Sequence, residues 1–213
     1  PSRLSAQRQL HTMLARRAAR LEPEAQSVLR VAACAGPAFT LALAAEVAEL
    51  PEPAVESAWT LLAREQLLQD DHLLLDTVAA AVLQATPVPV AQATHRALAA
   101  ALQARGERPE RVAQHWQSAE VWAPAAAAFA QAAREHAPRD AEVMLLWDRC
   151  ATAHRRAGQQ TEAAVADAAA LVAALSVEGE RDLQQRIDRM RAAAVTAAER
   201  LQLLLVEARA HIN

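Results

Sequence analysis

Residues 21–76 read LEPEAQSVLRVAACAGPAFTLALAAEVAELPEPAVESAWTLLAREQLLQDDHLLLD, and this stretch decides the fold. Pro23 predicts a helix start, because proline suits the first helical turn and the flanking acids favour the positive end of the helix dipole. Gly36-Pro37 predicts where that helix ends. Apolar residues recur at helical spacing between these limits, at Ala25, Val28, Leu29 and Ala32.

Two further helices and a short hairpin are predicted in the rest of the stretch. Thr40 is expected to cap a second helix that ends near Leu50, and Glu52 opens a third. The core-facing residues of the third helix are Val55, Ala58, Trp59 and Leu62. Two short apolar runs flank Asp70-Asp71, which predicts a small β-hairpin.

This order of elements resembles a winged helix. Residues 20–71 are similar to the winged-helix segment of STAND-type ATPases, which are large bacterial signalling and transcription regulators. The likeness rests on an apolar helix ending near Gly36, on Phe39 opening the next helix, and on the run LLAREQLLQDD. In that family the segment follows the nucleotide-binding domain and precedes helical repeats. The resemblance implies that this chain, which starts at Pro1 without a methionine, is a fragment of such a regulator.

After the hairpin, Asp76 is expected to cap a helix that ends where Thr86-Pro87-Val88-Pro89 breaks it, because each proline disfavours helix in the preceding residue. The next helix is expected from Val90 to Arg105, with Gly106 ending it. We therefore expect three regions: a linker helix over 1–20, a winged-helix-like domain over 21–86 and a helical repeat domain over 90–213.

A weak internal repeat begins at Gly106. Its clearer copy, residues 144–171, reads MLLWDRCATAHRRAGQQTEAAVADAAAL and resembles a tetratricopeptide (TPR) repeat. Gly158 falls where that family turns, but Asp167 replaces a usual aromatic and Leu175 a usual proline. The earlier copy spans residues 106–137. The positions at which the two copies match the family are Ala113, Trp116, Ala125, Phe129, Ala132, Trp147, Cys150, Ala151, His154, Ala163 and Ala170.

Residues 178–213 predict a long amphipathic helix with an unpartnered apolar seam. The seam residues are Leu183, Ile187, Met190, Ala194, Ala197, Leu201, Leu204 and Ala208. Its partner is expected to be the preceding repeat, a further repeat of a longer parent, or a second chain.

The composition narrows the class of protein. Of the 213 residues 53% are hydrophobic but only 3% aromatic, which favours closely packed helices over a large sheet. The net charge of −3 gives no general attraction to nucleic acid. No apolar run approaches the roughly 20 residues of a membrane span, and the two distant cysteines predict a reducing cytoplasm. There is no lysine, so the chain has no P-loop.

No catalytic, cofactor-binding or metal-binding residue is predicted. Cys150 and His154 lie four residues apart on one helix, but no second pair accompanies them and both coincide with packing positions of the repeat. No serine lies in a nucleophile-elbow motif. The candidate partner-binding residues are Trp116, Trp122, Trp147 and His154, each of which also fits a core-packing role.

The candidate DNA contacts are Arg16, Arg17 and Arg20, which also fit the solvated face of a linker helix. The third helix of the winged-helix-like domain opposes DNA binding. From Thr40 to Asp76 one basic residue, Arg64, stands against eight acids, so this surface repels phosphates.

These observations predict an all-α protein with one small β-hairpin: a winged-helix-like unit followed by TPR-like antiparallel helical hairpins that form an α-solenoid. The expected function is that of a non-enzymatic, cytoplasmic regulatory region of a STAND-type transcriptional regulator. It would couple an adjacent ATPase domain to a protein, peptide or inducer bound on the repeats. Two alternatives stay open. One is a DNA-binding winged-helix factor that uses the arginines above with Arg30, and the other is a scaffold that dimerises through its C-terminal helix.

Overall fold

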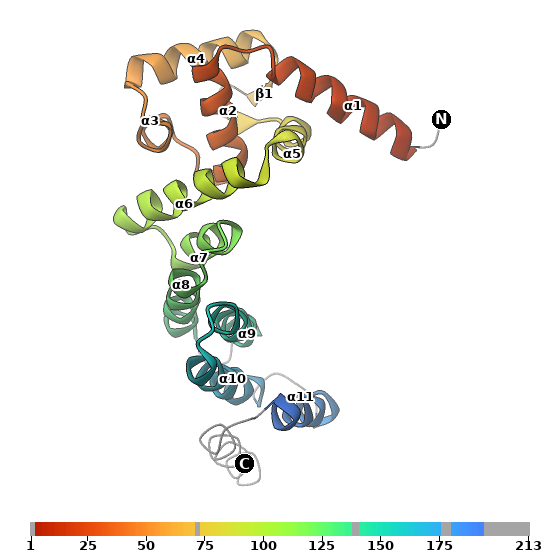
Figure 1. Ribbon diagram of the computed structural model, residues 1–213, viewed down its shortest axis with the longest axis vertical. Helices are drawn as coiled ribbons and strands as arrows, with labels where there is room; N and C mark the ends of the chain where they lie inside the picture. Colours follow the sequence, from red (N-terminus) through yellow and green to blue (C-terminus); the bar gives the residue numbers. More distant parts are fainter. Residues whose placement is uncertain (1–2, 71–72, 138–140, 176–179, 194–213) are drawn as a thin grey trace. The chain divides into compact units, whose positions relative to one another are not determined.

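The structure is a computed structural model that describes residues 3–70, 73–137, 141–175 and 180–193 (Figure 1). The described residues form eleven α-helices, one 3-10 turn and two short strands, so the prediction of an all-α fold is confirmed. The chain divides into two compact units, 1–105 and 106–213.

The first unit contains six helices, and α2 is the central one. Its elements are α1 (Arg3–Ala18), α2 (Pro23–Ala35), the 3-10 turn η1 (Gly36–Ala38), α3 (Leu41–Ala48), α4 (Glu52–Arg64), β1 (Leu68–Asp70), β2 (Leu73–Leu74), α5 (Asp76–Ala85) and α6 (Val88–Ala104). The strands pair antiparallel, with Leu68 opposite Leu74. Helix α2 packs against α3, α4, α5 and α6, so most of the unit is built on it.

Helix boundaries in this unit follow the local chemistry of the sequence. Pro23 occupies the first turn of α2, and Gly36 ends that helix with a φ of +53°, a conformation that glycine adopts without strain. The Thr40 side chain accepts a hydrogen bond from the Leu43 amide at 3.0 Å and so caps α3 as predicted. Asp76 lies in the first turn of α5 but makes no capping hydrogen bond, because Leu75 occupies the N-cap position. The prediction that Asp76 caps this helix is wrong.

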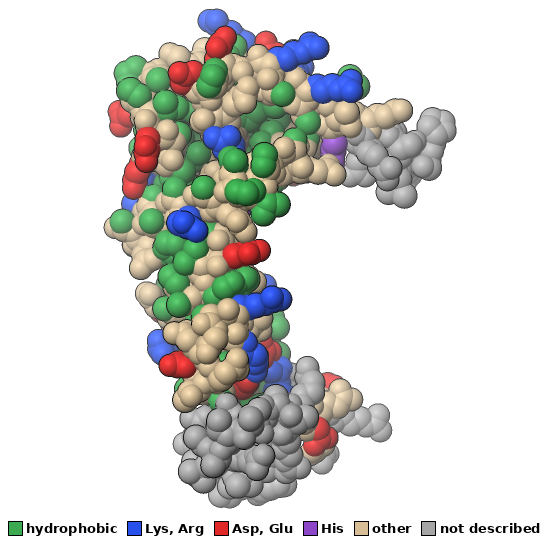
Figure 2. Space-filling model, viewed as in Figure 1, with side chains coloured by type: hydrophobic (Ala, Val, Ile, Leu, Met, Phe, Trp, Pro, Cys, Tyr) green, Lys and Arg blue, Asp and Glu red, His purple; other side chains and the backbone are tan. Residues whose placement is uncertain are grey.

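The core of the first unit is aliphatic with one aromatic pair. All four predicted core residues of α4 are buried, and the Trp59 ring stacks on Phe39 with centroids 4.4 Å apart. The stack joins α4 to the turn before α3 and adds an aromatic contribution to the buried apolar area. On the outside, acidic side chains line the edge formed by α3 and the start of α4 (Figure 2).

Helix α6 belongs to the first unit. It packs on α2 and α3, and the Arg105 guanidinium that follows it lies 2.8 Å from a Glu46 carboxylate oxygen. The sequence places a domain boundary at 87–89 and assigns the following helix to the repeats. In the structure the prolines at 87 and 89 separate α5 from α6 within the first unit. The two units divide between Arg105 and Gly106, and the φ of Gly106 is +66°.

The second unit is a succession of helices, each packed on the next: α7 (Pro109–Ser118), α8 (Trp122–Glu135), α9 (Ala141–Arg156), α10 (Gln160–Ala174) and α11 (Glu180–Ala193). Short connections make neighbouring helices antiparallel. Gly158 turns the chain between α9 and α10 with a φ of +78°. The alanines of the predicted repeat are all buried, at Ala113, Ala125, Ala132, Ala151, Ala163 and Ala170.

Asp167, which stands where a TPR repeat usually has an aromatic residue, forms an ion pair. Its carboxylate pairs with Arg155 of α9, and burial raises the pKa of this carboxyl group although the guanidinium opposes the shift. Helix α11 is held to α10 by Leu171 and Ile187, and to α9 by Arg186, whose guanidinium lies 2.6 Å from an Asp148 oxygen. The apolar seam predicted over 178–213 therefore finds the preceding repeat as partner through 193, and its remainder lies outside the described residues.

The Thr40 cap gives a direct test of the first unit. Because a side-chain cap contributes about 1 kcal/mol, Thr40→Ala is expected to lower the free energy of unfolding by about that amount in urea titrations followed by circular dichroism. Thr60→Ala is the matched control. The Thr60 hydroxyl donates to the Glu56 carbonyl of its own helix, so its loss leaves no backbone group unpaired and should change stability little. Equal effects of the two substitutions would contradict the capping role.

Candidate functional site

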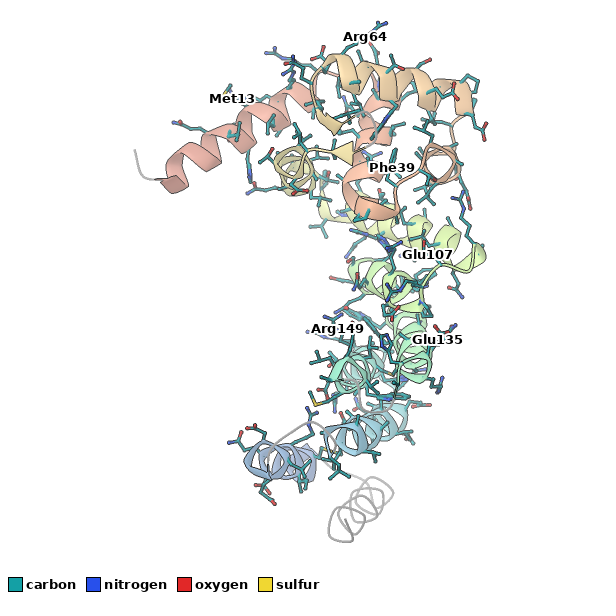
Figure 3. All side chains as sticks on the ribbon, turned by 180° about the vertical axis from the view of Figure 1, so that it is seen from behind. Met13, Phe39, Arg64, Glu107, Glu135 and Arg149 are labelled. Carbon is teal, nitrogen blue, oxygen red and sulfur yellow. The ribbon has the colours of Figure 1, made fainter. Side chains whose placement is uncertain are left out.

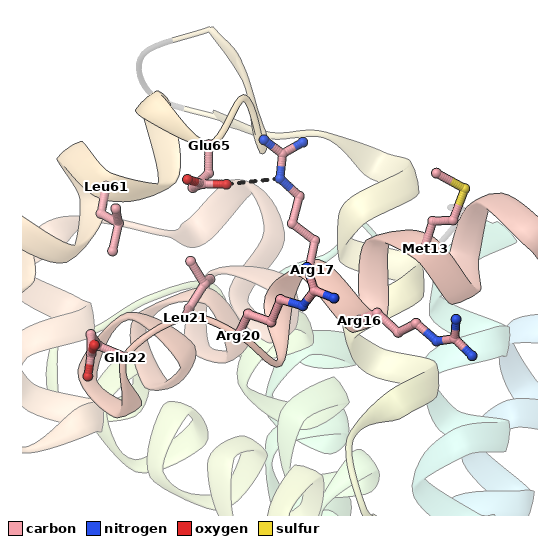
Figure 4. A pocket seen from close by; sticks show the side chains of 8 residues that line it. All are labelled: Met13, Arg16, Arg17, Arg20, Leu21, Glu22, Leu61 and Glu65. Carbon is pink, nitrogen blue, oxygen red and sulfur yellow. Dashed lines mark hydrogen bonds and ion pairs between the residues drawn. The ribbon is translucent and has the colours of Figure 1, made fainter.

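The three predicted arginines line one hollow of the first unit. It has a volume of about 730 Å³ and lies where the end of α1 and the start of α2 meet α4 (Figure 4). Its lining residues are Met13, Arg16, Arg17, Arg20, Leu21, Glu22, Leu61 and Glu65. The structure thus brings the arginines together with two acids and three apolar side chains.

Among the described residues, an acid neutralises one of these arginines, Arg17. Arg17 Nε lies 2.9 Å from Glu65 Oε2, in an exposed pair that contributes at most about 1 kcal/mol. Within the described residues, no acid forms an ion pair with Arg16 or Arg20. Leu21 and Leu61 point into the hollow, and Met13 projects outward from α1 with 68% of its surface exposed (Figures 3 and 4). The hollow combines an apolar floor with two uncommitted cations.

The exposed face of α4 is unsuited to phosphates. It presents Glu52 and Glu56 against Arg64, which projects from the end of the helix (Figure 3). The hydroxyls of Ser57 and Thr60 donate to backbone carbonyls of the same helix, at 2.8 and 2.9 Å. A recognition helix in the major groove needs free hydrogen-bond donors and cations on this face, and α4 offers a single cation, Arg64.

Two of the candidate tryptophans lie at different places along the α8–α9 pair, Trp122 at the start of α8 and Trp147 in the middle of α9. Arg156 of α9 stacks over Trp122 at 5.8 Å from the ring centroid, and Arg134 of α8 stacks over Trp147 at 5.5 Å. Twelve residues of helix separate Trp122 from Arg134, a span of about 18 Å. The two rings therefore do not form a single site.

Cation–π contacts occupy these ring faces between helices. A third one, with Arg149 at 5.9 Å from the Phe129 centroid, lies between the same two helices. The sequence analysis predicts none of the three contacts, because each depends on how α8 packs against α9. A signal is present for one of them: Trp122 opens α8 and Arg156 ends α9, so an antiparallel pair brings the two to the same end, whereas Trp147 lies in the middle of α9.

The other two candidates lie on separate helices. Trp116 is half-buried on α7, and His154 Nδ1 lies 2.9 Å from Gln159 Oε1, a contact that spans the turn at Gly158. Cys150, one turn before His154, is buried, and burial raises the pKa of its thiol to about 11, so the thiolate is not available at neutral pH. This environment fits packing of the hairpin.

An acid–base pair that the sequence did not predict ties α7 to the end of α8. His136 Nε2 lies 2.5 Å from Glu110 Oε1, and both side chains are largely buried. Burial alone would raise the pKa of Glu110, but the hydrogen bond from His136 and the charge of Arg108 hold it below its ordinary value. The 26 residues between the partners leave no local pattern that could have revealed the pair.

No protein-family model, curated protein or solved structure matches the chain. In the part of the chain that the structure describes, no cluster of three or more His, Cys, Asp or Glu residues is placed to hold a metal ion. Within the same part, every helix is too short or too polar to cross a membrane.

The Glu110–His136 pair predicts a pH dependence of stability. Because the folded pKa of Glu110 lies below its ordinary value of 4.5, its contribution is complete above that pH and is lost as the pH falls through the folded value. The difference in melting temperature between wild type and Glu110→Gln should therefore be full above pH 4.5 and shrink as the pH falls below that value. Glu135→Gln, on the exposed face of α8, is the control. A difference that is constant with pH would contradict the assignment.

Proposed function

We propose that this chain is a non-enzymatic regulatory and protein-interaction region of a STAND-type transcriptional regulator. In this proposal the first unit is a winged-helix-like domain, with β1 and β2 as its wing, and the second unit is a short TPR-like solenoid. The chain would couple the nucleotide state of a neighbouring ATPase domain to a protein, peptide or inducer bound on the repeats, in the cytoplasm.

The observation that carries the proposal is the packing order of the second unit. Each helix from α7 to α11 packs on the next in sequence, with alanines buried at the interfaces and Gly158 at a positive φ in the tight turn. Helices stacked in this way present extended surfaces, which repeat proteins use to bind other chains. The step from fold to function is by analogy with those proteins.

The electrostatics of the first unit support protein contact over DNA contact. The exposed face of α4 is acidic, and this is the helix that a winged-helix DNA reader would place in the major groove. The exposed acids of α3 and the start of α4 extend the same charge around the edge of the unit (Figure 2). A basic or neutral protein surface is the complementary partner for this face.

The second candidate function, DNA binding, is favoured by one observation. Arg16 and Arg20 border the hollow without an acid paired to either among the described residues, so both are available to a phosphate. Under this alternative α1, and not α4, would contact the nucleic acid.

A titration into labelled duplex DNA separates the two functions. At low salt and about 50 µM chain, a concentration at which non-specific DNA binders associate, fluorescence anisotropy is expected to stay unchanged. A rise that weakens steeply with salt, and disappears in the Arg16→Ala/Arg17→Ala/Arg20→Ala variant but not in Arg64→Ala, would favour the DNA-binding alternative. Arg64→Ala is the control because it removes the one basic residue of α4.

The STAND assignment makes a separate prediction about the gene. A regulator of this class needs a nucleotide-binding domain before the winged helix, so the gene is expected to encode a G-x-x-x-x-G-K-[ST] motif upstream of this chain. Sequencing that region tests the prediction. An upstream region that encodes no such motif overturns the assignment and leaves only the interaction role of the helical unit.

A further inference from the structure

A second, smaller hollow lies in the first unit on the other side of α1. It has a volume of about 160 Å³ and is bounded by the end of α1, by α2, and by the end of α5 with the turn that follows. Its walls are mainly aliphatic. The apolar side chains that form them include Ala15, Ala18, Ala19, Leu29, Val82 and Ala85.

Arg30 is the one charged residue in this lining. Its Nη2 donates to Ser27 Oγ at 3.2 Å, while its Nε is fully buried and finds no acceptor among the described residues. No described acid forms an ion pair with it. A fully buried Nε is out of reach of a ligand, so the capacity of this guanidinium to bind an anion rests on its charge, which no described acid neutralises, and on its place in the lining of the hollow.

The other polar groups of the lining already donate within the protein. Gln26 Nε2 donates to the carbonyls of Ala19 and Leu21, at 3.2 and 2.7 Å. Thr86 Oγ1 donates to the Val82 carbonyl at 2.7 Å. Arg30 is therefore the side chain through which the hollow can recognise a ligand, and the rest of the contact surface is apolar.

We propose that this hollow binds the carboxylate of a small aliphatic acid, with Arg30 as the anion-binding residue and the alanine walls around the alkyl tail. A guanidinium matches the two oxygens of a carboxylate, and alanine walls match methyl and methylene groups. The volume equals that of about five water molecules, which fits an acid the size of propionate or butyrate and excludes a nucleotide. The inference does not depend on the proposed function, since it concerns residues of α1, α2 and α5 alone.

The lining combines one cation with aliphatic walls, and this combination selects the class of ligand. Inorganic phosphate carries more charge and more oxygen atoms than one guanidinium can satisfy, so its remaining oxygens would face aliphatic walls and lose hydration. A neutral alcohol of the same size would leave the cation without a counter-charge. A short-chain carboxylate satisfies both parts of the site at once.

The test is a titration of the full chain with sodium butyrate, followed by amide chemical shifts in ¹H–¹⁵N NMR spectra. Saturable shifts are expected at the amides that line the hollow, including those of Ala19, Arg30 and Ala85, below about 20 mM butyrate, as befits so small a ligand. Sodium phosphate and butanol at the same concentrations are expected to give no saturable shift there. No shift with butyrate, or equal saturable shifts with phosphate, overturns the proposal.

Two variants separate the roles of charge and shape. Arg30→Met keeps the aliphatic stem but removes the charge, and should weaken butyrate binding about tenfold or more, the effect of losing one charge-assisted hydrogen-bonded contact. Ala85→Leu keeps the charge but fills the wall at the end of α5, and should weaken butyrate while sparing the smaller formate. Arg16→Met, in the other hollow, is the control and should bind butyrate as wild type does. Unchanged affinity in both Arg30→Met and Ala85→Leu, with melting temperatures near wild type, overturns the site.

Discussion

The close approach of helices through small side chains is the constraint on which this structure depends. With 53% of residues hydrophobic but only 3% aromatic, the chain cannot fill wide gaps between helices with large rings. It buries alanines instead, and the distance between helix axes shrinks to match the side chains at the contact. The second unit shows this most clearly, because Ala113, Ala132 and Ala151 are completely buried there. A larger residue at such a position cannot be accommodated by moving a single side chain, so it pushes the two helices apart.

In a core made of small residues, a few larger or polar contacts determine how the helices are aligned with one another. In the first unit the Phe39–Trp59 stack and the Thr40 cap fix where α3 begins relative to α4. In the second unit the arginines stacked over aromatic rings and the pair of Glu110 with His136 act between helices whose alanine faces would tolerate sliding. Polar and cation–π contacts have direction, whereas alanine contacts have little, so these contacts fix the register.

Local chemistry explains what the sequence could predict. Pro23, Gly36 and Thr40 act within one turn of the chain, so the sequence alone predicts their effects on helix ends. The helical spacing of apolar residues likewise predicts which residues of α4 are buried. The assignment of α6 failed for the opposite reason. Its proline-rich start is a local break, but its partners α2 and α3 are distant in sequence and hold it in the first unit.

The candidate sites show the same division more sharply. Spacing on one helix is enough to group Arg16, Arg17 and Arg20. The ion pair between Arg17 and Glu65 could not be predicted in this way, because it depends on how α1 packs near α4. The tryptophans could be named as candidates for partner binding or core packing, yet the arginines that stack over Trp122 and Trp147 come from the neighbouring helix. Arg30 was grouped with possible DNA contacts because its charge was visible and its burial was not.

The distribution of charge gives the first unit two faces with different chemistry. Acids on α3 and α4 face outward without basic neighbours of equal number. The cations Arg16, Arg17 and Arg20 border a hollow of mixed charged and apolar lining, and Arg30 borders one that is mainly aliphatic. A phosphate backbone is long and evenly charged, and binding it requires cations spread over an open surface. A single cation in a hollow with mainly aliphatic walls, such as Arg30, suits a ligand that carries one anionic group on an apolar body. The chemistry of each surface of the first unit therefore arises from where its arginines and acids are placed, since its net charge is nearly balanced.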